Sequence, residues 1–379
     1  MPETPAPAAV GMAIEEVDTP ALLIDLDAFE RNLKRMADAI DGSGARLRPH
    51  SKTHKCPIVA QRQIEQGAVG VCCQKVGEAE AMVYGGVGDV LISNQIVGAP
   101  KLARLAALAR QAKVAVCVDD AGNVVDLDAA AGVAGVILDV LVEIDVGAAR
   151  CGVEPGTPSV KLAQEIDRAS NLRFAGLQAY QGRSQHIRAY SDRRAAAEAA
   201  IALTNETLAE LAESGFKCDI IGGAGTGTYQ FEAASGVYNE LQAGSYIFMD
   251  VDYGKNENVD GAPFTDFENS LFVYATVMSR VTEDRAVLDA GLKALSVDAG
   301  LPSLWDVPGV TFTGASDEHG KLEIDNTVAG GNRVLKLGDK VKVVPGHVDP
   351  TVNLHDWYVG IRNGRVECLW PITARGMLR

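Results

Sequence analysis

The sequence lacks paired-cysteine motifs, an excess of basic residues and any long uninterrupted apolar run. Its seven cysteines are scattered and none forms a C-x-x-C unit, so we expect reduced thiols and no disulfide framework. A net charge of −15 would repel nucleic acids and anionic lipid, and we expect neither nucleic acid nor a membrane as a partner. There is no basic, apolar leader and no membrane-length segment, so the expected location is cytoplasmic.

The chain does contain enough apolar material for a large core. Of its 379 residues, 47% are hydrophobic and 22% are charged, which is typical of a globular protein and not of a disordered one. This length favours one large domain with a smaller companion.

Short apolar runs alternate with helix-like segments through the first two thirds of the chain. A strand expected at 19–26 leads into a helix at 26–40, which the turn residues 41–44 end. Eight further strands are expected at 45–50, 68–74, 89–94, 113–119, 137–147, 174–180, 218–223 and 240–248. Helices are expected between them, for example at 99–112 and at 191–215, where Gly215 is the cap. This α/β alternation predicts a (β/α)8 barrel of the TIM type.

After about residue 265 the pattern changes to short alternating segments separated by turn signals, which predicts a mainly antiparallel β domain. Asn363 and Gly364 between two such segments predict a hairpin turn. We therefore expect three parts. Residues 1–26 form an arm and a strand that joins the β domain, residues 27–264 form the barrel, and residues 265–379 form the β domain.

The loops that follow barrel strands usually carry the active site, and here they are strongly polar. Lys52 lies between two histidines after the first barrel strand, and the small residues Gly222–Gly227 follow the seventh. Such a glycine run lets backbone N–H groups close on a phosphate, and a lysine of lowered pKa is a nucleophile for a cofactor aldehyde. A tight turn and a surface lysine are the alternatives. The spacing is not G-x-G-x-x-G, which disfavours a dinucleotide site.

A third motif, PGHVDPT, lies in the expected β domain and contains His347 and Asp349. Residues two apart on an extended strand point to the same side, so this pair is a candidate ligand set for a divalent cation. One nitrogen and one carboxylate suit an open Mn²⁺ or Mg²⁺ site better than a closed zinc site. The alternative is a hydrogen-bonded His–Asp pair in a loop.

These motifs together resemble the alanine racemase-like, fold-type III pyridoxal-phosphate enzymes, and within them the D-threonine aldolase and D-3-hydroxyaspartate aldolase group. The resemblance spans nearly the whole chain. It rests on TPALLIDLDAFERNL, RLRPHSKTHKCP, GVCCQKVGEAEA, EIDVGAARCGV, ASGVYNELQAGSYIFMDVDYG, SDEHG and PGHVDPTVNLHDWYV. It implies a barrel that binds pyridoxal 5'-phosphate, a β domain that carries the metal site, and a homodimer.

The resemblance also implies a role for individual residues. Lys52 would form the Schiff base with the cofactor, Arg150 would contact its phenolic oxygen, and Gln74 and Tyr180 would line its ring. The phosphate would be held by Gly225, Thr226, Gly227 and Ser245, and the divalent metal by His347 and Asp349. Tyr246 and Asn94 are placed at the barrel mouth by position alone.

The activity that the resemblance implies is a carbon–carbon lyase reaction, the retro-aldol cleavage of D-3-hydroxy amino acids. D-Threonine would give glycine and acetaldehyde, and D-3-hydroxyaspartate would give glycine and glyoxylate. We take His186 as the candidate base, with Asp317 and His319 near the substrate. Arg183 or Arg188 is a candidate partner for a second substrate carboxylate.

Three other activities remain as alternatives. A dehydratase on the same fold would use the same cofactor and a metal to expel the β-hydroxyl group. A racemase is less favoured, because it would leave the H-x-D motif without a role. A non-catalytic pyridoxal-phosphate-binding protein is disfavoured by the additional β domain.

Overall fold

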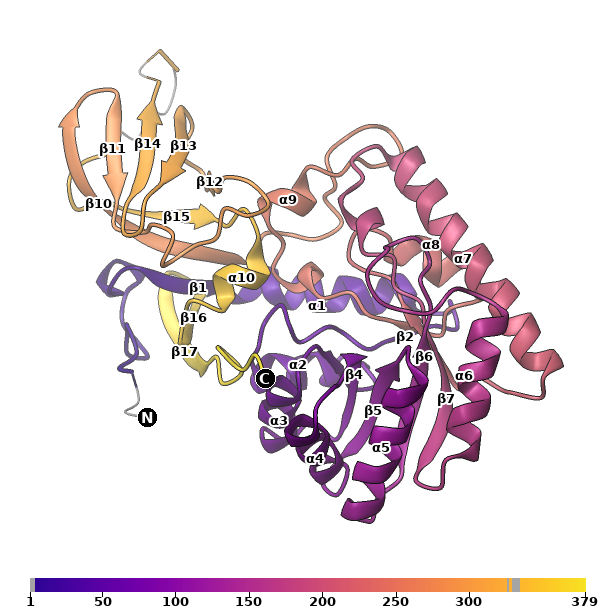
Figure 1. Ribbon diagram of the computed structural model, residues 1–379. Helices are drawn as coiled ribbons and strands as arrows, with labels where there is room; N and C mark the ends of the chain where they lie inside the picture. Colours follow the sequence, from indigo (N-terminus) through magenta and orange to yellow (C-terminus); the bar gives the residue numbers. More distant parts are fainter. Residues whose placement is uncertain (1–3, 326, 329–334) are drawn as a thin grey trace.

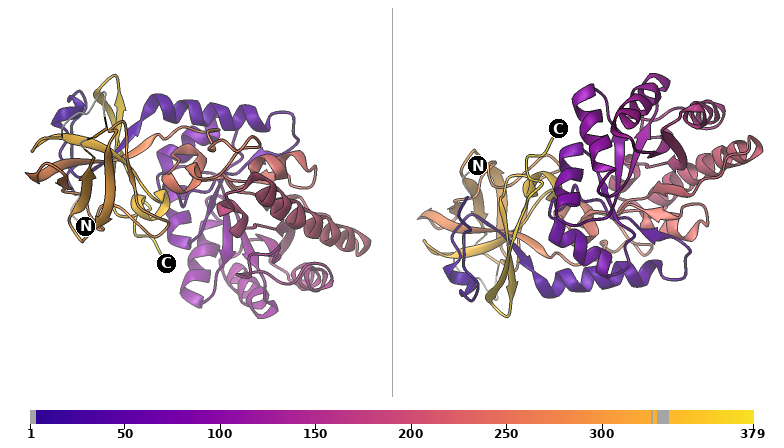
Figure 2. Two further views of the ribbon diagram at one scale, coloured as in Figure 1. Left: turned by 90° about the horizontal axis from the view of Figure 1, so that it is seen from above. Right: turned by 90° about the horizontal axis from the view of Figure 1, so that it is seen from below.

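The computed structural model describes residues 4–325, 327–328 and 335–379, so the first three residues of the expected arm lie outside it. The described chain forms a barrel and a separate β domain, which lie side by side (Figure 1). Figure 2 shows helix α1 (Leu26–Ile40) running along one edge of the barrel, away from the β domain.

Eight parallel strands form the barrel, in the spatial order β2-β9-β8-β7-β6-β5-β4-β3. Hydrogen bonds from Ser51 N to Cys72 O and from Cys72 N to Pro49 O join the two ends of this series and close the ring. The strands are β2 (Arg46–Leu47), β3 (Val71–Cys73), β4 (Asp89–Gln95), β5 (Lys113–Val118), β6 (Leu138–Glu143), β7 (Leu172–Gln178), β8 (Ile220–Gly223) and β9 (Glu240–Leu241). The predicted fold class is confirmed.

Helices cover the outside of the barrel (Figures 1 and 2). After α1 they are α2 (Pro57–Glu65), α3 (Val76–Tyr84), α4 (Ala99–Leu108), α5 (Ala121–Ala134), α6 (Thr157–Arg168), α7 (Tyr190–Glu213) and α8 (Tyr229–Ala234). The Asp25 carboxylate caps α1 by accepting a hydrogen bond from Ala28 N, and α1 buries the apolar face predicted from its spacing. Gly215 follows α7 with φ +87°, the left-handed conformation of a helix cap.

The β domain is a mixed, mostly antiparallel sheet of nine strands. Its first strand, β1 (Ala21–Asp25), lies between β10 and β16 and leads directly into α1. The others are β10 (Leu271–Thr282), β11 (Arg285–Leu288), β12 (Ser303–Leu304), β13 (Val310–Ala315), β14 (Gly320–Ile324), β15 (Lys340–Val344), β16 (Trp357–Arg362) and β17 (Arg365–Pro371). Asn363 and Gly364 have φ angles of 50° and 71° in the β16–β17 turn, as the hairpin prediction requires.

Short helical segments connect the regular elements. They are the 3-10 helices η1 (Ile14–Glu16), η2 (Arg183–His186) and η3 (Ser245–Ile247), and the α-helices α9 (Val251–Gly254) and α10 (Val348–Val352). The eighth predicted barrel strand, 240–248, is therefore wrong beyond Leu241, because η3 replaces its second half. None of the helices in the described residues is both long enough and apolar enough to cross a membrane.

Helices α9 and α10 lie where the barrel meets the β domain. Val251 N donates to Pro345 O at 3.0 Å, and Val348 N donates to the Asp250 carboxylate at 2.9 Å. His347 caps α10 and Asp349 lies in its first turn, so the expectation that both stand on an extended strand is wrong. The helix, and not strand alternation, sets their directions.

Candidate active site

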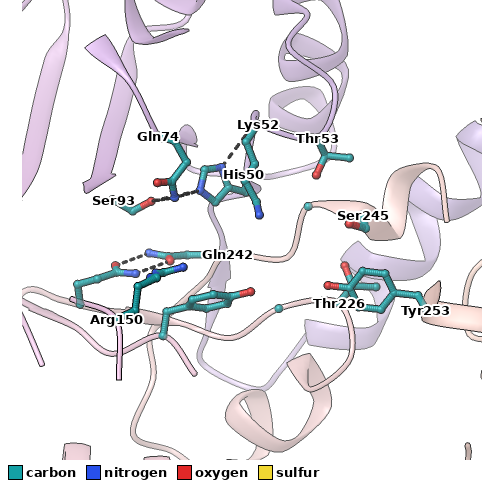
Figure 3. A pocket seen from close by; sticks show the side chains of 14 residues that line it. His50, Lys52, Thr53, Gln74, Ser93, Arg150, Thr226, Gln242, Ser245 and Tyr253 are labelled. Atoms are coloured by element: carbon teal, nitrogen blue, oxygen red, sulfur yellow. Dashed lines mark hydrogen bonds between the residues drawn. The ribbon is translucent and has the colours of Figure 1, made fainter. Parts of the chain in front are cut away.

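A cavity of about 470 Å³ opens at the carboxyl ends of the barrel strands (Figure 3). Seven of the predicted cofactor residues line it, namely Lys52, Gln74, Arg150, Tyr180, Gly225, Thr226 and Ser245. Seven more residues, to which the sequence assigned no role, also line it, namely His50, Thr53, Ser93, Gln178, Gln242, Gly244 and Tyr253. The barrel thus gathers residues from widely separated loops around one concave space.

Lys52 reaches from the barrel to a carboxylate of the β domain. Its Nζ atom lies 3.2 Å from Oδ2 of Asp349 on α10, and Figure 3 shows the amine directed into the cavity. The negative charge of Asp349 raises the pKa of Lys52 above its ordinary value, which is the opposite of the lowered pKa expected from the sequence. Burial would raise the pKa of Asp349, but the cationic Lys52 and His347 hold it below its usual range.

His50, Gln74 and Ser93 form one wall of the cavity (Figure 3). His50 Nδ1 accepts a hydrogen bond from Lys52 N at 3.3 Å, and its Nε2 lies 2.8 Å from Gln74 Nε2 and 3.3 Å from Ser93 Oγ. Burial lowers the pKa of His50 well below its ordinary value, so the ring is neutral. The neutral ring thus contacts both polar side chains of this wall through its Nε2 edge.

Arg150, Tyr180 and two glutamines form the opposite side. The Arg150 guanidinium lies 5.8 Å from the centre of the Tyr180 ring, a cation–π contact that leaves its N–H groups able to bind an anionic oxygen. Gln178 and Gln242 donate to each other at 2.8 and 2.7 Å. A Cβ at Gly222 would lie 2.6 Å from Gln242 Nε2, so this position has no room for a side chain.

The expected anion cradle is only partly as predicted. Thr226 and Ser245 line it, and Thr226 Oγ1 accepts a hydrogen bond from Tyr246 N at 2.9 Å. Gly227 does not line the cavity, and its N–H donates to Gln185 Oε1 at 2.9 Å, so its role stays a prediction. The Tyr246 ring also turns away from the cavity, and its hydroxyl accepts a hydrogen bond from Gln63 at 3.1 Å.

His347 and Asp349 have the donor atoms that a divalent cation needs. His347 Nδ1 lies 2.8 Å from Asp298 Oδ2, which leaves Nε2 as the donor to a metal. Asp349 Oδ1 is buried and has no hydrogen-bond partner within the described chain, as expected for an atom that coordinates an ion. Over the described ranges no group of three or more His, Cys, Asp or Glu residues surrounds a single point.

The candidate base lies near the cavity without lining it. His186 is half-exposed, its Nδ1 lies 2.5 Å from Asp252 Oδ2, and its ring centre lies 5.8 Å from that of Tyr253, which does line the cavity. Arg183, three residues earlier, is exposed. Arg188 is already bound to the Asp252 carboxylate and to Asn256, which removes it as a candidate partner for a second substrate carboxylate.

Three remaining candidates do not reach the cavity. Asp317 and His319 are exposed in the turn between β13 and β14, and neither lines the cavity of its own chain. Asn94 donates to the carbonyl oxygen of Gln74 at 2.9 Å and so supports the wall from behind. The placement of Asp317 and His319 beside the substrate is therefore not seen within one chain.

Comparison with known proteins agrees with this geometry. Residues 24–252 match the family described as "Alanine racemase, N-terminal domain", and residues 270–361 match the "Putative serine dehydratase domain". The chain is 48% identical to a 3-hydroxy-D-aspartate aldolase of Paracoccus denitrificans (strain Pd 1222) over 98% of this chain and 95% of that protein. It is 49% identical to a D-threonine aldolase of an Arthrobacter species, over 99% and 97%.

A solved structure gives the same result. The crystal structure of the D-threonine aldolase from Filomicrobium marinum superposes with a TM-score of 0.94 and 51% identity, over 99% of this chain and 100% of that one. The resemblance inferred from the sequence motifs is confirmed.

Proposed function

Since the chain belongs to the family of D-threonine and 3-hydroxy-D-aspartate aldolases, we propose that it is a carbon–carbon lyase that cleaves D-3-hydroxy amino acids. D-Threonine would give glycine and acetaldehyde. The observation that carries the proposal is the 3.2 Å approach of Lys52 Nζ to Asp349 Oδ2. It brings a barrel amine and a candidate metal ligand of the β domain within reach of one small amino acid.

The cavity residues fit pyridoxal 5'-phosphate. Lys52 supplies the amine that would bind its aldehyde, Arg150 a cation for its phenolic oxygen, and Thr226 and Ser245 hydroxyl groups for its phosphate. Gln74 and Tyr180 lie on opposite sides of the space for the ring. When bound, the cofactor supplies an electron sink for the pair released from the Cα–Cβ bond.

His347 and Asp349 fit a divalent cation, Mn²⁺ or Mg²⁺, through His347 Nε2 and the unpaired Asp349 Oδ1. A cation there would acidify the substrate β-hydroxyl. His186 would take the hydroxyl proton as the Cα–Cβ bond breaks, and the carbonyl product would leave. Cα then gains a proton, which gives glycine.

The test is product identification with purified enzyme. D-Threonine and D-3-hydroxyaspartate are incubated separately, with and without Mn²⁺, and glycine and the carbonyl product are measured. Lys52→Ala should lose both turnover and the visible absorbance of the bound cofactor, while the exposed control Lys101→Ala keeps both. Turnover and absorbance retained by Lys52→Ala would refute its role.

Two alternatives have specific support. A preference for D-3-hydroxyaspartate is favoured by the 48% identity to a 3-hydroxy-D-aspartate aldolase, and it would appear as glyoxylate in the same assay. A dehydratase is favoured by the match of residues 270–361, and it would appear as a keto acid and ammonia without glycine.

We also infer that the enzyme is a cytoplasmic homodimer. The exposed position of Asp317 and His319 supports the dimer, because these residues would then be free to approach the cavity of a second chain. Light scattering on the eluted protein tests the assembly, since a monomer mass at assay concentration would exclude it.

A further inference from the structure

The segment Asp250–Tyr253 joins three chemically important parts of the molecule. Asp250 Oδ1 accepts a hydrogen bond from Tyr253 N at 2.9 Å, and its Oδ2 accepts one from Val348 N at 2.9 Å. Asp252 N donates to Gly346 O at 3.3 Å. The segment is therefore attached to the residues on either side of His347 by the Asp250 carboxylate and the Asp252 backbone N–H, and Tyr253 lines the cavity.

The side chain of Asp252 makes a separate set of contacts. It is 3% exposed, and its two oxygens bind different groups. Oδ2 lies 2.5 Å from His186 Nδ1, while Oδ1 accepts a hydrogen bond from Arg188, which also donates to the Asp252 carbonyl at 2.7 Å. Burial would raise the pKa of Asp252, but His186 and Arg188 lower it to about 2, so the carboxylate is ionised at neutral pH.

We propose that Asp252 is a positioning residue that fixes the tautomer and the orientation of the His186 ring. Through the contacts of its segment with Gly346 and Val348, it also fixes the position of His186 relative to His347. An ionised carboxylate can only accept a hydrogen bond, so the hydrogen of a neutral His186 ring stands on Nδ1. Nε2 then carries the lone pair, and this is the atom that would take the hydroxyl proton. The same division of labour between a carboxylate and a histidine is known from serine proteases.

The surroundings of His186 support a dedicated pair. Asp252 from α9 and Arg188 from the η2–α7 connection are the charged side chains of this cluster, and the Tyr253 ring stands beside the imidazole. Arg188 binds Oδ1 of the Asp252 carboxylate, and Oδ2 is directed towards His186. Because the inference rests on the proposed function, its test must separate the two.

The first test compares wild type, Asp252→Asn, His186→Gln and the double variant as holoenzymes. Asp252→Asn should lower kcat about a hundredfold and change KM much less, because an amide no longer enforces the tautomer. In the His186→Gln background, Asp252→Asn should add less than about threefold. Asp252→Glu, which restores the charge, should recover part of the activity.

The outcomes are distinguishable. If wild type forms no glycine from any D-3-hydroxy amino acid, the proposed function fails. If wild type is active but the kcat of Asp252→Asn stays within about threefold of the wild-type value, only the inference is overturned. A full further loss in the His186→Gln background would also overturn it.

A second test needs no variant of Asp252 and so does not depend on its folding. Holoenzyme labelled with ¹⁵N-histidine reports which ring nitrogen carries the hydrogen, and the His186 signals are identified by their loss in His186→Gln. We expect a neutral ring with its hydrogen on Nδ1. A neutral ring with its hydrogen on Nε2 would overturn the inference.

Discussion

In the expected anion cradle, Gly225 is the glycine with the least space for a side chain. A Cβ at this position would lie 2.4 Å from Oε1 of the buried Gln185, whose amide is held by Gly227 N and Thr228 Oγ1. Gly225→Ala should therefore displace the Gln185 amide and weaken cofactor binding about tenfold or more. Gly88→Ala, where the new methyl would meet no atom within 4 Å, should leave the affinity unchanged. Titration of the apoenzyme with pyridoxal phosphate measures both, and equal affinities would contradict the argument.

Glu232, on helix α8 after the same loop, should make the folding stability of the protein depend on pH. Glu232 is buried, and burial raises its pKa to about 8, while one of its oxygens lacks a partner in the described residues. The unfolded chain releases the Glu232 proton near pH 4.5, whereas the folded protein releases it only near pH 8. Between these two values the folded state binds one proton more than the unfolded state, so the stability of the fold falls as the pH rises. Glu232→Gln should therefore gain thermal stability relative to wild type across this range and keep a constant gain above it. If the difference in melting temperature between Glu232→Gln and wild type were the same at pH 5 and at pH 9, this prediction would be wrong.

At the scale of secondary structure, a buried ion pair holds the barrel closed. Arg48, which directly follows β2, donates to Glu240 on β9 at 2.6 Å and to Asp89 on β4 at 2.7 Å. Arg48→Met leaves Glu240 buried with only the partly exposed Arg46, and should cost about 3 kcal/mol of stability. Adding Glu240→Gln should recover part of this, because the stranded charge is removed.

Urea unfolding followed by circular dichroism measures the effect. The control is Arg62→Met, which removes an exposed pair of the same type and should change stability by less than about 0.5 kcal/mol. An Arg48→Met variant as stable as this control would show that the pair does not hold β2 to β9.

Elements with a regular residue pattern could be predicted from the sequence, and irregular ones could not. The helix at 26–40 has the predicted bounds, because an aspartate cap, apolar spacing and a glycine turn all agree there. η3 and α10 were missed, since apolar runs as short as 240–248 carry no period that separates a strand from a helical turn. The side-chain directions of Tyr246 and of the His347–Asp349 pair depended on these two elements.

The candidate site shows the same limit. Lys52, Arg150 and Thr226 could be assigned because they stand in distinctive motifs, and the structure brings them to one cavity. Gln178, Gln242 and Tyr253 give no local signal, because each becomes a lining residue only when the barrel closes. Gly227 belongs to the expected run, yet a contact from the distant Gln185 takes its N–H group.

At the scale of the whole molecule, the site is divided between the two domains. The candidate cofactor residues Lys52, Thr226 and Ser245 stand on the barrel, whereas the candidate cation ligands His347 and Asp349 stand at α10 in the β domain. Binding of the two groups should therefore be separable. Removal of the cation should abolish turnover while the cofactor stays in place.

Exhaustive EDTA treatment should eliminate aldehyde formation without changing the visible absorbance of the bound cofactor, and Mn²⁺ should restore the rate. Asp349→Asn should be as inactive as the EDTA-treated enzyme, and Mn²⁺ should not restore its rate. The substitution removes the negative charge from Asp349, whose Oδ1 has no hydrogen-bond partner in the described chain. Glu318→Gln, an exposed carboxylate of the same domain paired with Lys293, should behave as wild type. Full activity after EDTA would remove the cation from the reaction, and loss of cofactor absorbance on chelation would show that the two halves of the site are not independent.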